Sequence, residues 1–255
     1  MAERLQKWLA GQGIGSRREI ERWITAGRIE VDGQKAELGI KVTGTERIVI
    51  DGKQLRKPRE DRPQKSRVLI YNKPPGEICS RSDPEGRRTV FQSLPRVIGA
   101  RWITVGRLDY QTTGLLLVTT DGELANALMH PSGQQRREYV VRALGELSEE
   151  QKNKLLQGIK LEDGPAKFTS LEQTEGEGAN HSYRVVVTEG RNRIIRRMFE
   201  AVDCRVNRLM RVSYGSVLLP RNLRPGQFQE MSEQEVEQLI SSVQKNSRPF
   251  PSGDS

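Results

Sequence analysis

The chain has 255 residues and a mass of 28.9 kDa, and 35% of its residues are hydrophobic, so one sizeable core and a second, smaller domain are expected. Its formal net charge of +9 and pI near 9.8 favour a polyanionic partner, nucleic acid before any other. No apolar run reaches the roughly 18 residues of a membrane span, and the start MAERLQKWLA lacks the apolar core of a signal peptide. A cytoplasmic protein without a membrane partner is therefore expected.

Histidine and cysteine are scarce in the sequence. Cys79 and Cys204 are far apart and lack CxxC spacing, and the only histidines are His130 and His181. This composition predicts no disulfide framework and no metal site, and it leaves little room for a Ser/His/Asp triad. Any catalysis is expected to use other side chains and no bound metal.

The first 50 residues are expected to form two short helices followed by a small hairpin. Apolar residues recur at helical spacing over residues 3 to 10, and Ser16 with Glu19 forms a capping box that begins the second helix. Short strands around an Asp-Gly turn follow. Four arginines near the helix faces are placed to meet phosphates and stacked bases: Arg17, Arg18, Arg22 and Arg28. Nine basic against seven acidic residues give a net charge of only +2, so charge alone does not separate RNA binding from a solvated face.

The domain limits follow from shifts in composition. Residues 51–66, DGKQLRKPREDRPQKS, contain two prolines and no apolar periodicity, which predicts a flexible linker. Strand-like sequence from Arg67 onward opens the main domain, residues 67–240. Residues 241–255 are polar with two prolines and are expected to form a disordered tail.

The stretch Gly106–Gly122, GRLDYQTTGLLLVTTDG, organises the main domain. It places Asp109 in a short polar loop that runs into an apolar segment of the right length for a buried strand. Thr112 and Thr113 are expected to be local hydrogen-bond partners, with Gly114 relieving the backbone. Two interpretations stay open: a nucleophilic carboxylate held in a cleft, or an Asx-type turn closed by the same side chain. The local pattern alone favours the turn.

The rest of the main domain mixes helices and strands without regular alternation. We expect a helix through about Met129, a strand over Arg137–Arg142 that exposes Tyr139, a helix from Ser148 to Leu156, and a strand over Tyr183–Thr188. This pattern predicts an α+β fold with a largely antiparallel mixed sheet flanked by helices, in preference to a doubly wound sheet.

The segment from residue 189 to residue 211 is the densest basic region, with seven arginines against three acids and a net charge of +4. Its apolar residues fall at helical spacing from Ile194 onward, and Arg193, Arg196 and Arg197 are distributed around them. Contact with RNA is one interpretation of these arginines. A solvated helix face is the other.

These motifs resemble a known family. GRLDYQTTG resembles the signature loop of the pseudouridine synthases, in particular the branch acting on bacterial ribosomal RNA, and SRREIE with AGRIEVDG resembles the small S4 RNA-binding domain. The resemblance implies that Asp109 in GRLD is the catalytic nucleophile, that Tyr139 in REYVV stacks on the target base, and that Arg196 in RNRIIRR pairs with Asp109. Further substrate binding is predicted for Ile195, Arg193, Arg197 and Arg107, and RNA binding by an S4-like domain over residues 1–50 is predicted for Arg17, Arg18, Arg22 and Arg28.

The resemblance implies an enzyme that isomerises a specific uridine of large-subunit (23S) ribosomal RNA to pseudouridine, and a monomer is expected. The reaction is redox-neutral, so a carboxylate attacking ribose C1′ or uracil C6 needs no cofactor, once the base has left its stack. The competing interpretation is a noncatalytic RNA-binding ribosome assembly factor, which would not need Asp109, Tyr139 and Arg196 together. A ribonuclease is disfavoured because no histidine pair or carboxylate metal cluster is evident.

Overall fold

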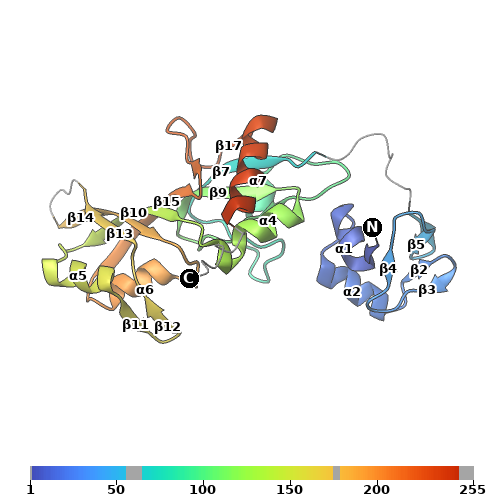
Figure 1. Ribbon diagram of the computed structural model, residues 1–255, viewed down its shortest axis with the longest axis horizontal. Coiled ribbons are helices and arrows are strands. Elements are labelled where there is room, and N and C mark those ends of the chain that lie inside the picture. The colour runs from blue at the N-terminus through green and yellow to red at the C-terminus, as the bar shows by residue number, and fades with distance from the viewer. Residues whose placement is uncertain (1, 56–64, 175–178, 247–255) are drawn as a thin grey trace, which may run out of the picture. The chain divides into compact units, whose positions relative to one another are not determined.

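The computed structural model describes residues 2–55, 65–174 and 179–246. They divide into two compact units, each of which is described here by itself (Figure 1). One unit combines the described residues of Met1–Ser66 with Pro95–Trp102 and Thr120–Gly122. The other holds the remaining described residues.

The N-terminal unit begins with the two predicted helices, α1 (Leu5–Gly11) and α2 (Arg17–Thr25). Its strands are β1 (Glu3–Arg4), β2 (Ile29–Val31), β3 (Gln34–Lys35), β4 (Lys41–Val42), β5 (Ile48–Ile50) and β6 (Lys53–Gln54). Strands β3-β2-β5-β6 form one sheet, and β1 pairs with β4. The capping box of α2 is confirmed, because Ser16 Oγ accepts from the Glu19 N–H at 3.1 Å and the Glu19 carboxylate accepts from the Ser16 N–H at 3.2 Å.

Strand β6 corrects the expected start of the linker at residue 51. Asp51 and Gly52 have positive φ angles of 49° and 73° and form a tight turn of the Asp-Gly type, which returns the chain onto β5. Strand β6 therefore belongs to the sheet. A linker can begin only after it, and residues 56–64 of the predicted linker lie outside the described residues.

The second unit is built on a nine-stranded sheet (Figure 1). Its strands are β7 (Val68–Lys73), β8 (Ile103–Thr104), β9 (Thr113–Thr119), β10 (Arg137–Leu144), β13 (Ser170–Gln173), β14 (Asn180–Val187), β15 (Arg205–Tyr214), β16 (Val217–Leu218) and β17 (Phe228–Glu230). The order is β13-β14-β10-β15-β9-β7-β17, with β16 beside β15 and β8 beside β9. Only the β15–β9 pair is parallel among the strand pairs of this sheet in the described chain. The predicted α+β fold with a largely antiparallel sheet is confirmed.

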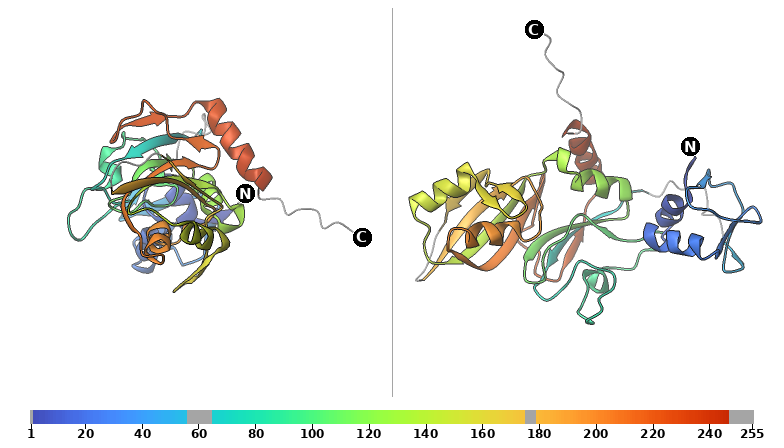
Figure 2. Two further views of the ribbon diagram at one scale, coloured as in Figure 1. Left: turned by 90° about the vertical axis from the view of Figure 1, so that its left-hand side faces the viewer. Right: turned by 90° about the horizontal axis from the view of Figure 1, so that it is seen from below.

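Five helices and a two-stranded ribbon accompany this sheet in the part of the chain that the structure describes. They are α3 (Val90–Ser93), α4 (Gly122–Met129), α5 (Glu149–Gln157), α6 (Ile194–Glu200) and α7 (Glu233–Asn246), with the ribbon β11 (Ile159–Leu161) and β12 (Gly164–Ala166). Helices α4 and α7 lie side by side (Figure 2), and Leu128 of α4 and Leu239 of α7 share a buried cluster with Leu117 of β9. No helix among the described residues is long and apolar enough to cross a membrane.

Helix α7 corrects the expected start of the tail at residue 241. The helix continues to Asn246 because Val236, Leu239 and Val243 recur at helical spacing and are all buried against the same core. Residues 247–255 of the predicted tail lie outside the described residues.

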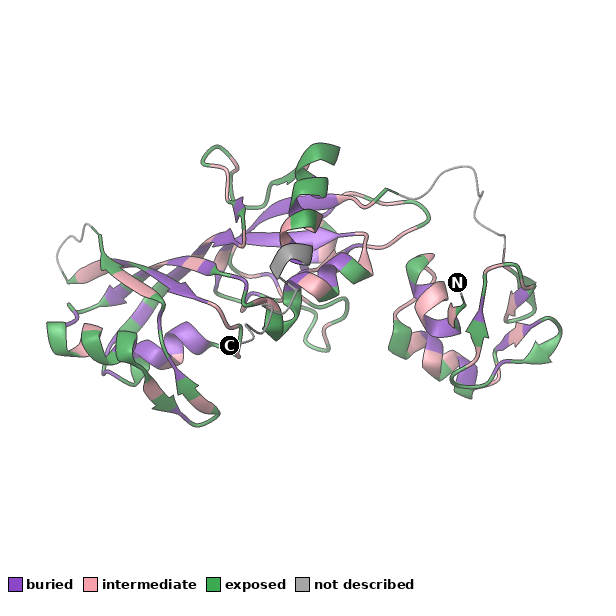
Figure 3. Ribbon diagram, viewed as in Figure 1, coloured by how far each residue is buried: buried purple, intermediate pink, exposed green. Residues whose placement is uncertain are grey.

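The centre of the sheet explains the apolar run after the signature loop. Every residue of β7 is buried, as is every residue of β9 after the first (Figure 3). Strands buried on both faces are continuously apolar, as in LLLV. The loop that carries Asp109 therefore ends at a strand that is buried at the centre of the sheet.

Candidate active site

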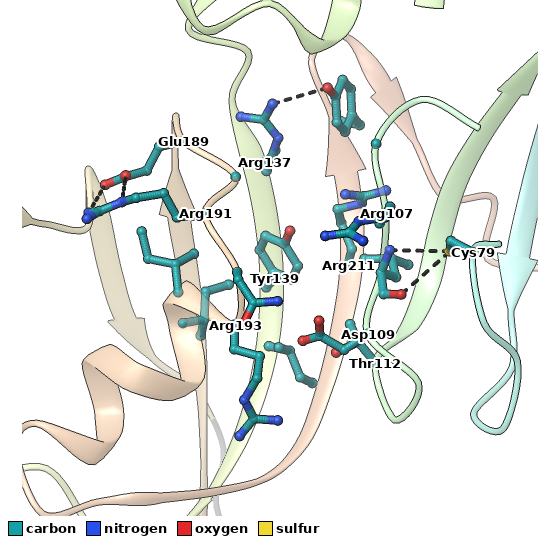
Figure 4. Close-up of a pocket in the computed structure, with 18 of the residues that line it drawn as sticks. Cys79, Arg107, Asp109, Thr112, Arg137, Tyr139, Glu189, Arg191, Arg193 and Arg211 are labelled. Carbon is teal, nitrogen blue, oxygen red and sulfur yellow. Dashed lines mark hydrogen bonds and ion pairs between the residues drawn. The ribbon is translucent and has the colours of Figure 1, made fainter. Parts of the chain in front are cut away.

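A pocket of about 760 Å³ lies over this sheet (Figure 4). Its lining comes from the loop ahead of β9, from β10, from β15, and from the segment that joins β14 to α6. Five of the predicted site residues line it: Arg107, Asp109, Tyr139, Arg193 and Ile195. The fold thus brings three separate sequence motifs to one cavity.

The carboxylate of Asp109 makes no hydrogen bond within the described chain. The main chain closes its turn instead, since the Thr112 N–H donates to the Asp109 carbonyl at 3.0 Å. The expected Asx-type turn is wrong, and so are the expected threonine contacts. Thr113 Oγ1 donates to the Leu209 carbonyl at 3.4 Å, and Thr112 Oγ1 is buried without a partner among the described residues. The Asp109 carboxylate is left free to meet a ligand in the pocket (Figure 4).

Lys73 anchors the loop that carries Asp109. It is 0% exposed, and its ammonium donates to the carbonyls of Pro74 at 2.9 Å, Thr112 at 3.0 Å and Tyr110 at 3.3 Å. Burial lowers the pKa of Lys73, while the nearby negative charges, including that of Asp109, raise it. These bonds tie the part of the loop that follows Asp109 to the end of β7. The sequence predicted only strand-like structure from Arg67 onward, and this anchor was missed.

Gly114 lies where β9 and β15 pair, and it lets their backbones approach closely. It pairs with Arg211 across the parallel β9–β15 contact, and a Cβ atom there would lie 2.2 Å from the Arg211 carbonyl oxygen. Its φ of 96° also favours glycine. The glycine that ends the signature loop is therefore required for the close approach of the two backbones.

Tyr139 lies on the floor of the pocket. The prediction that β10 exposes it is wrong, because the ring is only 8% exposed. Strand β10 is an interior strand between β14 and β15, and the segments around Asp109 and Arg193 line the same pocket above it. The ring nevertheless faces the cavity, where a planar base can stack on it (Figure 4).

Arg196 does not form the predicted ion pair with Asp109 in this structure. Its Nη1 donates to the Val206 carbonyl at 2.8 Å, and the side chain is 9% exposed. Burial lowers the pKa of Arg196, the charge of Arg193 lowers it further, and the charges of Asp109 and Glu200 raise it. The predicted pair is thus an electrostatic interaction at longer range, because α6 directs the guanidinium towards β15.

The remaining predicted arginines separate into two groups. Arg107 and Arg193 line the pocket and are exposed, as a residue that meets RNA has to be. Arg197 does not line the pocket, and its two Nη atoms bind the carboxylate of Asp163 at 2.9 Å each. Its role in substrate binding therefore stays a prediction, since this structure engages the side chain away from the pocket. Arg197 instead ties α6 to the β11–β12 ribbon.

Two buried arginines of the pocket were not predicted from the sequence. Arg137 begins β10 and donates to the carbonyls of Gln135 and Thr188 and to the Tyr214 hydroxyl. Arg211 lies on β15, with its guanidinium 5.0 Å from the centre of the Tyr214 ring. The period-two spacing of Arg137 and Tyr139 was a usable signal that both side chains face one side of the sheet.

The predicted RNA-binding arginines of the N-terminal unit are all exposed. Arg17, Arg18 and Arg22 lie on α2 and have no partner among the described residues. Arg28 differs, because its Nε donates to Asp51 at 2.8 Å and its guanidinium lies 5.1 Å from the centre of the Trp23 ring. The three arginines of α2 thus remain available to phosphates.

Two family models match two successive parts of the chain. The model of the S4 domain matches residues 3–48, and the model of the RNA pseudouridylate synthases matches residues 67–201. The chain belongs to the RNA pseudouridylate synthase family. The predicted family, and the S4 domain with it, are therefore confirmed.

Individual relatives within the family agree. The chain is 52% identical over 244 residues to ribosomal large subunit pseudouridine synthase B of Pseudomonas aeruginosa, covering 95% of this chain and 63% of that protein. It is 54% identical over 233 residues to the protein of the same name from Escherichia coli K12, covering 91% of this chain and 80% of that protein. The chain is also similar to a crystal structure of a pseudouridylate synthase, with 25% identity and a TM-score of 0.64. The match covers 92% of this chain and 99% of that one.

Proposed function

We propose that this pseudouridine synthase isomerises a specific uridine of large-subunit (23S) ribosomal RNA, with Asp109 as the nucleophile. The observation that carries the proposal is the Asp109 carboxylate, which faces a cationic pocket and has no hydrogen-bond partner in the described chain. A carboxylate that only shaped its loop would bind the neighbouring N–H groups. The names of the relatives support the class of RNA.

The reaction begins when the target uridine leaves its stack and enters the pocket. Asp109 attacks ribose C1′ or uracil C6, the bond between N1 and C1′ breaks, and its electron pair stays with the uracil. The ring then turns, C5 bonds to C1′, the bond to Asp109 breaks and frees the carboxylate, and the proton on C5 is lost while N1 gains one. No atom or electron is gained or lost overall, so the residues of the chain suffice for this mechanism.

The other pocket residues take supporting roles in this proposal. Tyr139 receives the base, and Ile195 supplies apolar surface beside it. Arg107 and Arg193 are exposed at the pocket and bind the displaced backbone. Arg196 acts on Asp109 through charge, which stabilises the carboxylate whenever it is released from the substrate.

The decisive experiment incubates the protein with protein-free large-subunit ribosomal RNA. Pseudouridine is then mapped by carbodiimide modification and reverse transcription, and one stop absent from the untreated RNA is expected. RNA binding without any new pseudouridine would favour the noncatalytic assembly factor. A short stem-loop around the mapped site, assayed after dialysis of the enzyme against EDTA, tests whether activity persists without a divalent metal.

Arg196→Met is expected to slow isomerisation by about 100-fold. The loss of the hydrogen bond to the Val206 carbonyl should lower the free energy of unfolding by only about 1–3 kcal/mol. Single-turnover rates and urea unfolding curves measure the two effects. Arg205→Met is the matched control, because Arg205 is exposed and outside the pocket. Equal rates for both variants would assign Arg196 to a structural role only.

Replacing Arg17, Arg18 and Arg22 with glutamine should weaken binding to the ribosomal RNA and make it less sensitive to salt. If each arginine neutralises one phosphate, the slope of log affinity against log salt concentration falls by about 2. The fold of α2 should survive, because its capping box and buried Ile20 and Ile24 are unchanged. Filter binding over a salt series measures the slope.

A second triple variant controls for net charge in this salt series. Lys154, Lys160 and Lys167 are exposed in the other unit, and their replacement with glutamine removes the same charge. Its slope is expected to change much less. Equal changes in the two slopes would mean that the total charge, rather than the α2 face, sets the affinity.

We propose that the protein acts as a cytoplasmic monomer. We also propose that its S4 domain, which extends through β6, and its catalytic domain, which extends through α7, are joined by a linker. The basic charge and the class of RNA support the location. Sedimentation of the free protein tests the monomer, and limited proteolysis between the two family matches tests the linker.

A further inference from the structure

Arg211 is a buried cation in the pocket with unused hydrogen-bond donors. Its side chain is 2% exposed, and no carboxylate of the described chain pairs with it. Nε donates to the Leu115 carbonyl at 2.7 Å. Nη2 is buried without a partner, and no other bond from the guanidinium occurs within the described residues. A desolvated cation in this state favours an oxygen acceptor supplied by a ligand.

A bulge in β15 places Arg211 beside the base-stacking residue. The register of β10 and β15 pairs Glu138 with Ser213 and then Tyr139 with Arg211, so Val212 is the extra residue. Directly opposed residues in an antiparallel pair point to the same face and lie about 5 Å apart. A base stacked on Tyr139 therefore has the Arg211 guanidinium at its edge (Figure 4).

The other buried arginine of the pocket is engaged already. Arg137 uses its Nη atoms for the Gln135 and Thr188 carbonyls and for the Tyr214 hydroxyl. Arg191, which also lines the pocket, binds Glu189 and the β11–β12 ribbon. Arg211 is thus the buried arginine of this pocket, within the described chain, that has donors left for a substrate.

We propose that Arg211 binds a carbonyl oxygen of the flipped uracil and stabilises the negative charge that collects there. This inference rests on the proposed function. Cleavage of the bond between N1 and C1′ leaves an electron pair on the uracil, which delocalises onto O2 and O4. Addition of Asp109 to C6 instead pushes charge onto O4. Either route places new charge on an oxygen, and a preorganised buried donor stabilises the transition state in which it forms.

The position of Arg211 favours the base over a phosphate. The RNA strand has to leave the pocket on both sides of the target nucleotide, so its phosphates follow the exposed arginines Arg107 and Arg193. The base is the part of a flipped nucleotide that enters most deeply. Arg211 on the sheet floor is therefore placed for the base.

The test compares single-turnover rates of the full-length protein on one stem-loop that carries uridine, 2-thiouridine or 4-thiouridine at the target position. Sulfur accepts hydrogen bonds poorly, so at one of the two positions it should slow the wild type by about tenfold. Arg211→Met should be about 100-fold slower on uridine, with RNA affinity within a few-fold. The variant should also lose its sensitivity to sulfur. Arg211→Lys keeps the charge and should retain part of both effects.

Arg107→Met is the matched control and should keep the full sulfur effect, because Arg107 is expected to meet the backbone. Wild-type rates that are insensitive to both sulfur positions would overturn the inference, even if Arg211→Met failed to fold. If the effect of Arg211→Met depended on methylphosphonate substitution of a phosphate, rather than on sulfur in the base, the inference would be overturned in favour of a phosphate contact. A wild type inactive on the uridine stem-loop and on ribosomal RNA would reject the proposed function, and this inference with it.

Discussion

Asp109→Asn is expected to slow isomerisation by at least about 1,000-fold, while affinity for the RNA stays within a few-fold. The amide keeps the shape of the side chain but cannot supply the attacking oxygen anion. Because the carboxylate makes no hydrogen bond within the described chain, its replacement breaks none there. Tritium release from 5-tritiated uridine under single-turnover conditions measures the rate, and filter binding measures the affinity.

Asp203→Asn is the matched control for this substitution. Asp203 is exposed, does not line the pocket, and has a φ of 57°, a conformation that asparagine adopts readily. The control should keep the wild-type rate. An Asp109→Asn variant that turned over at a rate close to that of Asp203→Asn would remove the nucleophile from the mechanism.

Lys73→Met is expected to damage both the fold and the activity. It leaves the carbonyl groups of Pro74, Tyr110 and Thr112 without their ammonium donor, which should lower the free energy of unfolding by about 2–5 kcal/mol. Two of these carbonyls, those of Tyr110 and Thr112, lie in the Asp109 loop. The loop should therefore shift, and a misplacement of about 1 Å costs roughly 100-fold in rate.

Urea unfolding curves and single-turnover rates below the unfolding transition separate the two effects of Lys73→Met. Lys160→Met, on the exposed face of β11, is the control and should change neither quantity. A stable Lys73→Met protein with a normal rate would show that the backbone of the loop holds Asp109 without the ammonium group.

Features encoded within a few residues were predictable from the sequence. The capping box of α2 and the buried strand after the signature loop depend on local pattern, and both are present. The predicted start of the linker at residue 51 and the predicted start of the tail at residue 241 were wrong for a related reason. A tight Asp-Gly turn and one further buried valine, Val243, continue the structure past the shift in composition.

Features that depend on distant strands were not predictable. The partner of Arg196 is the Val206 carbonyl rather than Asp109, and that of Arg197 is Asp163 on a separate ribbon. The role of Arg211 depends on a bulge that sequence periodicity does not reveal. Tyr139, expected to be exposed, is buried because other segments cover an interior strand.

The parallel contact between β9 and β15 divides the catalytic sheet into two antiparallel halves. One half supplies the Asp109 loop and the other supplies Tyr139 and Arg211, yet the paired residues at the junction are only Met210 with Thr113 and Arg211 with Gly114. Hybrid chains that exchange whole halves between relatives should therefore keep a working pocket only if this short junction is preserved together with the bonds that cross it, from Arg211 to the Leu115 carbonyl and from Thr113 to the Leu209 carbonyl. Gly114, which has no side chain, is then the residue at which sequence changes in one half are constrained by the backbone of the other half.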